Sequence, residues 1–358
     1  MRRAILGRRA ILGSLLLAVV AFGQDNPAAR GGRRGAPDGA ANGEQAPRGG
    51  ARQLSKLIEG PDLGVKPVPN PLPLPAGMMF GALGGVVLNS KEHLFVFGGT
   101  RPELTQYKAD PLPLVEFDQN GKFVRAFGES LGYSSPHGFR IDDSDNFWVT
   151  DIGNHTVMKL NPKGDILLTL GTKGKAGVWD EAAGNHVLNQ PTDIALAKNG
   201  DVFVGQGHGG GGGGDPRILR FDKNGKYITS WSGKVNGPEA FTNVHAVVMD
   251  PDNHIWVGDR SAKKVLVFDV NGKLVNTIQM PVYVCSFYVA KNGQLYMLSG
   301  WDGQILKMDW TGQILAATGK PGRGLNQYGE AESMAINSKG EIFVADKVND
   351  YVQKLIPK

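Results

Sequence analysis

The stretch ILRFDKNGKYITSW, residues 218–231, consists of two alternating apolar runs joined by Asp-Lys-Asn-Gly. An Asn-Gly pair between two such runs is typical of a tight β-hairpin, because both residues tolerate the positive φ that the turn needs. Four more stretches repeat this pattern, at 114–127, 157–170, 265–278 and 305–318. The repetition predicts a fold built from one recurring unit.

A second hairpin precedes each of these stretches and ends in a recognisable apolar run. These runs are HLFVFG (93–98), NFWVTD (146–151), DVFVGQ (201–206), HIWVGD (254–259), QLYMLS (294–299) and, in a sixth unit, EIFVAD (341–346). Four short strands per unit, repeated six times, are typical of a β-propeller. No segment after the first two dozen residues shows a sustained 3.6-residue period, so we expect an all-β, six-bladed β-propeller of four-stranded blades over residues 65–358.

The sixth unit stops early, because only YVQKLIPK follows EIFVAD. Its missing outer strand has to come from elsewhere, and the region before the first repeat, around KPVPNPLPL (66–74) or GMMFGALG (77–84), is the natural donor. Such a pairing would close the ring and remove an open sheet edge. We therefore expect both ends of the propeller to share one blade.

The chain begins with a segment typical of an export signal. Four arginines precede a short apolar run within residues 1–23, and small residues follow it. The run is too short for a membrane-spanning helix. Residues 24–64 are rich in Gly, Ala, Arg and Pro and predict a flexible tether, so we expect a periplasmic or secreted protein without a transmembrane segment.

The formal net charge of +5 does not indicate nucleic-acid binding. The predicted signal holds four of the positive charges and no acid, and residues 24–55 add a further excess of two, which leaves −1 for residues 56–358. We therefore expect no nucleic-acid partner. Cys285 is the only cysteine, so the chain has no intramolecular disulfide, and a closed propeller predicts a monomer.

One repeat position carries the candidate chemistry. This position lies ahead of each of the six apolar runs quoted above. In units one to six it is occupied by Gly84, His137, Thr192, His245, Cys285 and Glu332. The position opens the innermost strand of each blade, so its side chains are expected at one height around the central channel. Since alternate blades are roughly 120° apart, His137, His245 and Glu332 should converge on one point.

Two imidazoles and a carboxylate suit a catalytic zinc or another divalent transition metal. We hypothesise that His137, His245 and Glu332 are metal ligands, with Cys285 as a candidate fourth. A single histidine at the start of a strand is usually a polar surface residue, but recurrence at one repeat position favours the metal site.

The units resemble the NHL-repeat family, in which an aspartate ends the second strand and an Asn follows three positions later. Asp151 with Asn154 and Asp346 with Asn349 match this pattern, and Asp259 matches it more weakly. We expect these aspartates to hold turns by accepting backbone N–H bonds, with Ca²⁺ binding as an alternative. The resemblance covers residues 80–358 and implies the fold rather than an activity.

Within that family the chain looks most like the peptidyl-α-hydroxyglycine α-amidating lyases. The segments that carry this likeness are SSPHGFRIDDSDNFWVTDIGNHTVMKL (134–160), NQPTDIALAKNGDVFVGQGH (189–208) and VHAVVMDPDNHIWVGDRSAKKV (244–265). In that family three axial histidines hold zinc, an arginine binds the substrate carboxylate and a tyrosine acts as base. The resemblance implies C–N bond cleavage assisted by a metal Lewis acid.

The motif is matched in part. His137 and His245 align with two zinc histidines, and Arg260 with an arginine of the site. Glu332 stands where the family has its third histidine, and His208 stands at the tyrosine position, which makes His208 a candidate acid or base.

Two further positions depart from the family. Ser333 replaces an aspartate, and the family's early arginine falls at Gly99, with Arg101 two positions on as a candidate substitute. The six glycines at 209–214 lack the Gly-Lys-Ser/Thr of a phosphate loop and predict a loose loop.

Two functions remain open from the sequence. The first is a metal-dependent lyase that acts on a small carboxylate- or amide-bearing substrate, with Arg260 and Arg101 binding the anion. The second is a propeller without catalytic activity that binds a protein or a cell-surface ligand.

Overall fold

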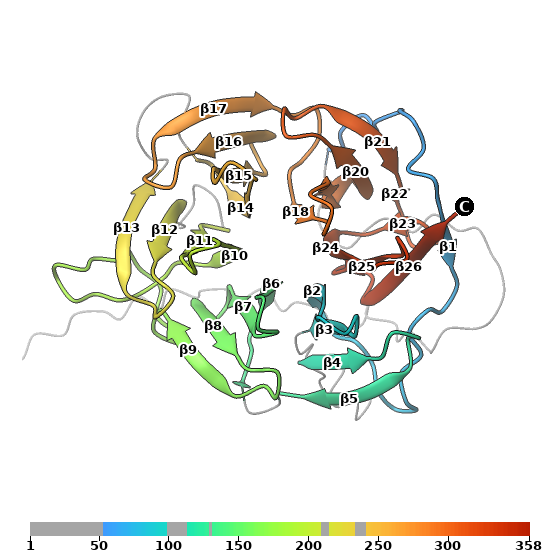
Figure 1. Ribbon diagram of the computed structural model, residues 1–358, viewed down its shortest axis with the longest axis horizontal. Coiled ribbons are helices and arrows are strands. Elements are labelled where there is room, and N and C mark those ends of the chain that lie inside the picture. Colours follow the sequence, from blue (N-terminus) through green and yellow to red (C-terminus); the bar gives the residue numbers. More distant parts are fainter. Residues whose placement is uncertain (1–52, 99–112, 129–130, 209–214, 233–240) are drawn as a thin grey trace, which may run out of the picture. The chain divides into compact units, whose positions relative to one another are not determined.

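The computed structural model describes residues 53–98, 113–128, 131–208, 215–232 and 241–358. This part of the chain forms six four-stranded antiparallel sheets around a central axis (Figure 1). The prediction of an all-β, six-bladed propeller is confirmed. The described residues contain no α-helix, and none of their segments is a helix with the length and hydrophobicity to cross a bilayer.

Each of the first five blades is one continuous segment of chain. Blade one consists of β2 (Leu83–Leu88), β3 (Leu94–Gly98), β4 (Leu114–Phe117) and β5 (Phe123–Phe127). Blade two consists of β6 (Pro136–Ile141), β7 (Phe147–Asp151), β8 (Thr156–Leu160) and β9 (Ile166–Leu170). Blade three consists of β10 (Pro191–Leu196), β11 (Val202–Gln206), β12 (Arg217–Phe221) and β13 (Tyr227–Ser232). Blade four consists of β14 (Val244–Met249), β15 (Ile255–Asp259), β16 (Lys264–Phe268) and β17 (Leu274–Gln279). Blade five consists of β18 (Ser286–Val289), β19 (Leu295–Ser299), the 3₁₀ turn η3 (Gly300–Asp302), β20 (Gln304–Met308) and β21 (Ile314–Thr318).

Blade six is assembled from both ends of the propeller. Its strands are β24 (Ala331–Ile336), β25 (Ile342–Asp346), β26 (Tyr351–Pro357) and β1 (Val65–Val68), and a short parallel pair, β22 (Lys320–Pro321) with β23 (Gln327–Tyr328), precedes them. β1 pairs antiparallel with β26, from Val65 opposite Pro357 to Val68 opposite Lys354. The predicted ring closure is confirmed, and the closing strand VKPV overlaps the first of the two predicted donor segments, 66–74.

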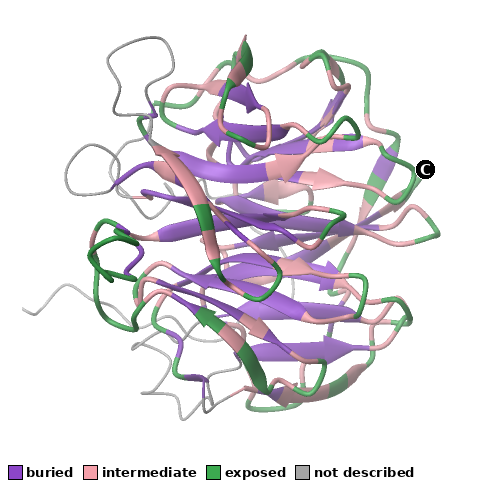
Figure 2. Ribbon diagram, turned by 60° about the vertical axis from the view of Figure 1, so that its left-hand side comes forward, coloured by how far each residue is buried: buried purple, intermediate pink, exposed green. Residues whose placement is uncertain are grey.

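Burial follows the order of the strands within a blade. The second strands β7, β11, β15 and β25 are buried throughout, whereas the outermost strand β9 is largely exposed. Figure 2 shows the same gradient, with exposed residues at the turns and the outer strands. The strand at the axis is therefore held rigidly, which suits it to position a site.

Hydrophobic cores lie between neighbouring blades. Phe97 of blade one packs against Phe139 of blade two, with ring centroids 5.4 Å apart, and Trp256 of blade four packs against Trp310 of blade five at 5.2 Å. The described residues contain one such cluster for each of the six contacts between blades. Face-to-face packing of the sheets thus replaces the missing disulfides as the source of stability.

The Asn-Gly turn predicted in the repeat also packs against the neighbouring blade. Gly272, in the turn between β16 and β17, has φ of 88°. A Cβ atom at this position would lie 2.7 Å from the ring of Trp231 in blade three. Glycine is therefore required twice here, for the backbone conformation and for the close approach.

The recurrent aspartates hold the turns, as predicted. Asp151 accepts hydrogen bonds from the backbone N–H groups of Ser134, Ser135, Gly153 and Asn154, at 2.8–3.1 Å. Asp259 and Asp346 make the matching bonds in blades four and six. The carboxylates tie the end of the second strand to the segment that enters the axial strand.

The chain between Gln53 and Gly64 contacts blade five. The backbone N–H of Ser55 donates to Asp302, that of Ile58 donates to Gln304, and that of Leu63 donates to the carbonyl of Ala317. The predicted tether, 24–64, therefore includes twelve residues at its end that pack against the propeller. The predicted signal and the rest of the tether lie outside the described residues.

Candidate metal site at the axis

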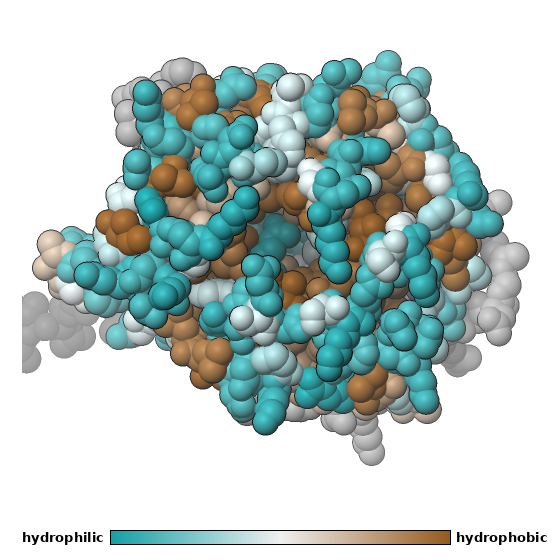
Figure 3. All heavy atoms as spheres, viewed as in Figure 1, coloured by the Kyte–Doolittle hydropathy of each residue, from teal (hydrophilic) through white to brown (hydrophobic). Residues whose placement is uncertain are grey.

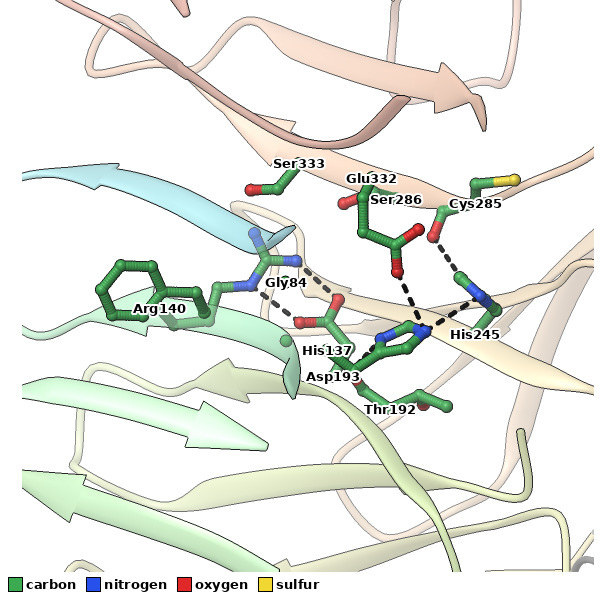
Figure 4. Close-up of a pocket in the computed structure, with 12 residues that line it drawn as sticks. Gly84, His137, Arg140, Thr192, Asp193, His245, Cys285, Ser286, Glu332 and Ser333 are labelled. Carbon is green, nitrogen blue, oxygen red and sulfur yellow. Dashed lines mark hydrogen bonds and ion pairs between the residues drawn. The ribbon is translucent and has the colours of Figure 1, made fainter. Parts of the chain in front are cut away.

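The six residues at the candidate repeat position, here called the column, line one small cavity at the axis, with a volume of about 10 Å³. These residues are Gly84, His137, Thr192, His245, Cys285 and Glu332. Figure 4 shows that the side chains of His137, His245 and Glu332 point toward one another from blades two, four and six. The repeat alignment thus located residues that meet in space.

The outer nitrogen of each histidine is held by a backbone carbonyl. Nδ1 of His137 donates to the carbonyl of Thr192 at 2.9 Å, and Nδ1 of His245 donates to the carbonyl of Cys285 at 2.6 Å. A carbonyl oxygen can only accept, so each Nδ1 carries a proton and a neutral ring presents the lone pair of Nε2. The two Nε2 atoms lie 3.1 Å apart.

Glu332 brings a third acceptor to the same point. Its Oε1 lies 2.9 Å from Nε2 of His137, and its side chain is 3% exposed. Oε2 of Glu332 is buried without a hydrogen-bond partner among the described residues. Lone pairs that face one another in a buried site require a cation between them, which is either a proton on His137 or a metal ion.

The spacing suits a metal ion. Two nitrogens bound at 2.0–2.1 Å to one tetrahedral zinc are about 3.3–3.4 Å apart, close to the separation of the two Nε2 atoms. Histidine ligands also commonly donate their other ring nitrogen to a carbonyl, as both do here. The donor set therefore fits a divalent transition metal.

His208 joins this group from the segment that follows β11. Ligand atoms of His137, His208 and His245 all lie within 4.8 Å of one another. The ring of His208 is 4.8 Å from that of His137 and 5.3 Å from that of His245, between centroids. The sequence predicted His208 as an acid or base, and the geometry also places it within reach of the metal position.

Arg260 lies against the same histidine. Its guanidinium donates from NH1 to Nε2 of His245 at 2.6 Å and stacks over Trp301, with Cζ 4.1 Å from the ring centroid. NH1 also lies 3.4 Å from Oε1 of Glu330, which accepts a 2.6 Å bond from the indole of Trp301. Arg260 thus lies beside the axial histidines and is held by aromatic and acidic neighbours.

Burial and nearby positive charge favour the neutral form of His245 and His208. Burial, with Arg260 and His137 nearby, lowers the pKa of His245 well below its usual value. Burial, with His137 and Arg260 nearby, lowers the pKa of His208 to about 2. Neutral imidazole is the form that binds a metal.

Glu332 is held as a carboxylate. Burial alone would raise its pKa, but the positive charge of Lys347 and the bond with His137 more than offset this and hold the pKa well below its usual value. Nζ of Lys347 lies 3.6 Å from Oε1 of Glu332. Sequence reasoning missed Lys347, although it directly follows the repeat aspartate Asp346.

Cys285 contributes its carbonyl rather than its thiol. Burial raises the pKa of the thiol to about 12, so it is protonated, and in Figure 4 its sulfur points away from the histidines. Arg101, the glycines at 209–214 and Gly99 lie outside the described residues.

An ion pair crosses the channel beneath the site. Arg140 of blade two makes a bidentate contact with Asp193 of blade three, at 2.9 and 2.5 Å, and donates to the carbonyl of Phe287 in blade five at 3.1 Å. Asp193 also accepts from the backbone N–H of Val247 in blade four. Four blades are thereby linked across the axis, and hydrophilic residues lie in the central hollow in Figure 3.

Comparison with known proteins gives the same fold and a group of relatives. A family model described as "6-bladed beta-propeller" matches residues 215–309. The peptidylglycine alpha-amidating monooxygenase of Rattus norvegicus is 27% identical over 76% of this chain and 30% of that protein. A probable peptidyl-alpha-hydroxyglycine alpha-amidating lyase of Caenorhabditis elegans is 36% identical over 41% of this chain and 40% of that protein. Relatives also include NHL repeat-containing proteins, as the sequence patterns predicted.

A streptogramin B lyase structure superposes with a TM-score of 0.55 at 13% identity, over 82% of this chain and 97% of that one. At this identity the likeness concerns the fold alone. The chain spans less than half the length of the curated relatives it matches.

Proposed function

We propose that this chain, a six-bladed β-propeller related to amidating lyases and amidating monooxygenases, is a metal-dependent lyase that cleaves a C–N bond in a small carboxylate-bearing substrate. The observation that carries the proposal is the meeting of His137, His245 and Glu332 through buried acceptor atoms. The relatives supply the reaction class, because the names of two of them specify amidation.

His137, His208 and His245 would hold the metal, with Glu332 beside them. This set supplies three neutral nitrogens and one carboxylate, which suits zinc and other divalent transition metals. When bound, the metal supplies a Lewis acid that lowers the pKa of a hydroxyl group. His208 is proposed as the third nitrogen ligand because the ligand atoms of the three histidines lie within 4.8 Å of one another, and Glu332 as proton acceptor or fourth ligand. This exchanges the roles that the sequence indicated for His208 and Glu332.

The protein's own residues would complete the reaction. For a substrate with a hydroxyl and an amide nitrogen on one carbon, the ionised Glu332 is placed to accept the hydroxyl proton. The electron pair of that O–H bond then forms a C=O bond, the C–N bond breaks, and the nitrogen takes up a proton. The products are an aldehyde and an amide, so atoms and charge balance.

Arg260 would orient the carboxylate of the substrate. The stack on Trp301 fixes the plane of the guanidinium beside His245. A metal bound at Nε2 of His245 would take the lone pair that accepts from NH1 and would release NH1 for the substrate. A guanidinium recognises a carboxylate through two parallel N–H bonds. A substrate bound this way would present its reacting carbon toward the histidines.

Turnover of a peptidyl-α-hydroxyglycine tests the proposal directly. We expect glyoxylate release by the metal-loaded protein, and loss of release in His137→Ala and in His245→Ala. Glu332→Gln should keep the metal and lose most of the rate, since an amide cannot accept the proton. A metal-free protein that binds a protein ligand instead would favour the scaffold alternative.

Export is proposed as well, on the residues of segment 1–23. Expression of the whole chain in a bacterium and mass analysis of the mature N-terminus test it. Recovery of an uncleaved chain in the cytoplasm would contradict export.

A further inference from the structure

A second repeat position lies beside the site and is occupied by a cationic residue in two blades. This position directly follows the second strand of a blade. Its backbone N–H donates to the carbonyl of the residue two places before the column residue of the same blade. The bonds are Ile152 to Ser135 at 2.9 Å, Arg260 to Asn243 at 3.0 Å and Lys347 to Glu330 at 3.0 Å. Because this bond recurs, Arg260 and Lys347 are structural equivalents in blades four and six.

Each of these cations lies next to a column residue of its own blade. Arg260 contacts His245, and Lys347 lies 3.6 Å from Glu332, measured between Nζ and Oε1. This ion pair is longer than the usual N–H···O hydrogen bond. The Lys347 side chain is 19% exposed, whereas that of Arg260 is 5% exposed.

With neutral imidazoles, the charged side chains of the site balance one another. The carboxylates of Glu330 and Glu332 offset the charges of Arg260 and Lys347. A divalent metal bound by neutral imidazoles would leave a net charge of +2 in a buried site, and such a charge favours an anionic ligand.

We infer that Lys347 is a substrate-binding residue that, together with Arg260, recognises an anionic group of the substrate. Arg260 is held by its stack on Trp301, and the more exposed Lys347 can reach an oxygen that the guanidinium does not cover. Two cations on alternate blades would hold a carboxylate from two sides of the metal position. This inference rests on the proposed function and adds a specificity residue to it.

Binding of two small probes to the metal-loaded protein tests the role of Lys347. The probes are N-acetylglycine and its neutral analogue N-acetylglycinamide, measured by calorimetry, with metal content and melting temperature recorded for each protein. We expect the wild type to bind the carboxylate at least about tenfold more tightly than the amide. Lys347→Met should lose about tenfold in affinity for the carboxylate and little for the amide, and Lys347→Arg should keep most of it.

The outcomes separate the two proposals. A wild type that binds metal, with Lys347→Met as tight a carboxylate binder as the wild type, overturns the role of Lys347 and leaves the lyase proposal standing. A folded Lys347→Met that loses its metal also overturns it, because Lys347 would then act through Glu332. A wild type that takes up no metal defeats the lyase proposal itself.

Discussion

Nε2 of His137 and Nε2 of His245 lie 3.1 Å apart, and the opposite nitrogen of each ring donates to a backbone carbonyl. The carbonyls of Thr192 and Cys285 fix both rings in the tautomer that presents a lone pair to the axis. Two lone pairs at this distance repel unless a cation lies between them. NH1 of Arg260 donates to Nε2 of His245, and we propose that a metal ion takes the place between the two rings, which is the central claim.

Acid should destabilise the metal-free protein through its histidines. An unfolded histidine titrates near 6.5, whereas the pKa of folded His208 is about 2. Between these values the unfolded state binds more protons, so the free energy of unfolding falls as the pH is lowered, by at most about 1.4 kcal/mol per pH unit for one group. His245 acts in the same direction.

Urea unfolding of the metal-free protein between pH 7 and pH 5 measures this dependence. The free energy of unfolding of His208→Gln should depend less steeply on pH than that of the wild type. The control His186→Gln replaces a side chain that is 52% exposed and should keep the wild-type dependence. Equal slopes for all three proteins would contradict a buried neutral His208.

Asp151 should contribute strongly to the stability of the fold, because it holds the turns of blade two. Asp151→Ala removes a buried carboxylate that accepts four backbone N–H bonds, including those of Ser134 and Ser135, which should cost about 3 kcal/mol of unfolding free energy. Asp143→Ala, an exposed change in the neighbouring turn, should stay within about 0.5 kcal/mol of the wild type. Equal stability of the two variants, measured by chemical denaturation, would argue against a structural role for the repeat aspartates.

The ion pair across the channel should be strongly coupled. Arg140→Met leaves the carboxylate of Asp193 buried beside an apolar side chain and should cost about 3–5 kcal/mol. Adding Asp193→Asn removes that charge and should recover part of the loss. A double variant whose loss equals the sum of the two single losses would show that the two residues do not interact.

Ring closure should depend on β1. Deleting residues 53–68 removes the strand that pairs with β26 and exposes its edge, so we expect loss of the cooperative thermal transition. Deleting residues 24–44 serves as the matched control and should leave the melting temperature within about 2 °C. A protein that keeps its transition without β1 would contradict closure by this strand.

The repeat explains why so much of this structure could be predicted. Since every blade repeats the same strand pattern despite loops of unequal length, aligning Asp151 with Asp259 and Asp346 also aligned His137 with His245 and Glu332, and the fold brought them together. The closing strand β1 followed from the missing strand of blade six.

Features that break the repeat were harder to predict. His208 follows β11 in a segment whose path no periodicity fixes, so its approach to His137 required the structure. The direction of the Cys285 thiol depends on side-chain packing, and its assignment as a candidate ligand rested on position alone. Lys347 is the blade-six equivalent of Arg260, so the repeat itself indicates its place.

Metal analysis of the purified protein tests the central claim most directly. After expression with zinc, iron, manganese, cobalt and nickel supplied, we predict about one transition-metal ion per chain in the wild type. His137→Ala and His245→Ala should lose it while retaining the β-rich circular dichroism spectrum, and His254→Ala, outside the axial site, should keep it. A folded wild-type protein that contains no transition metal under these conditions would contradict the account.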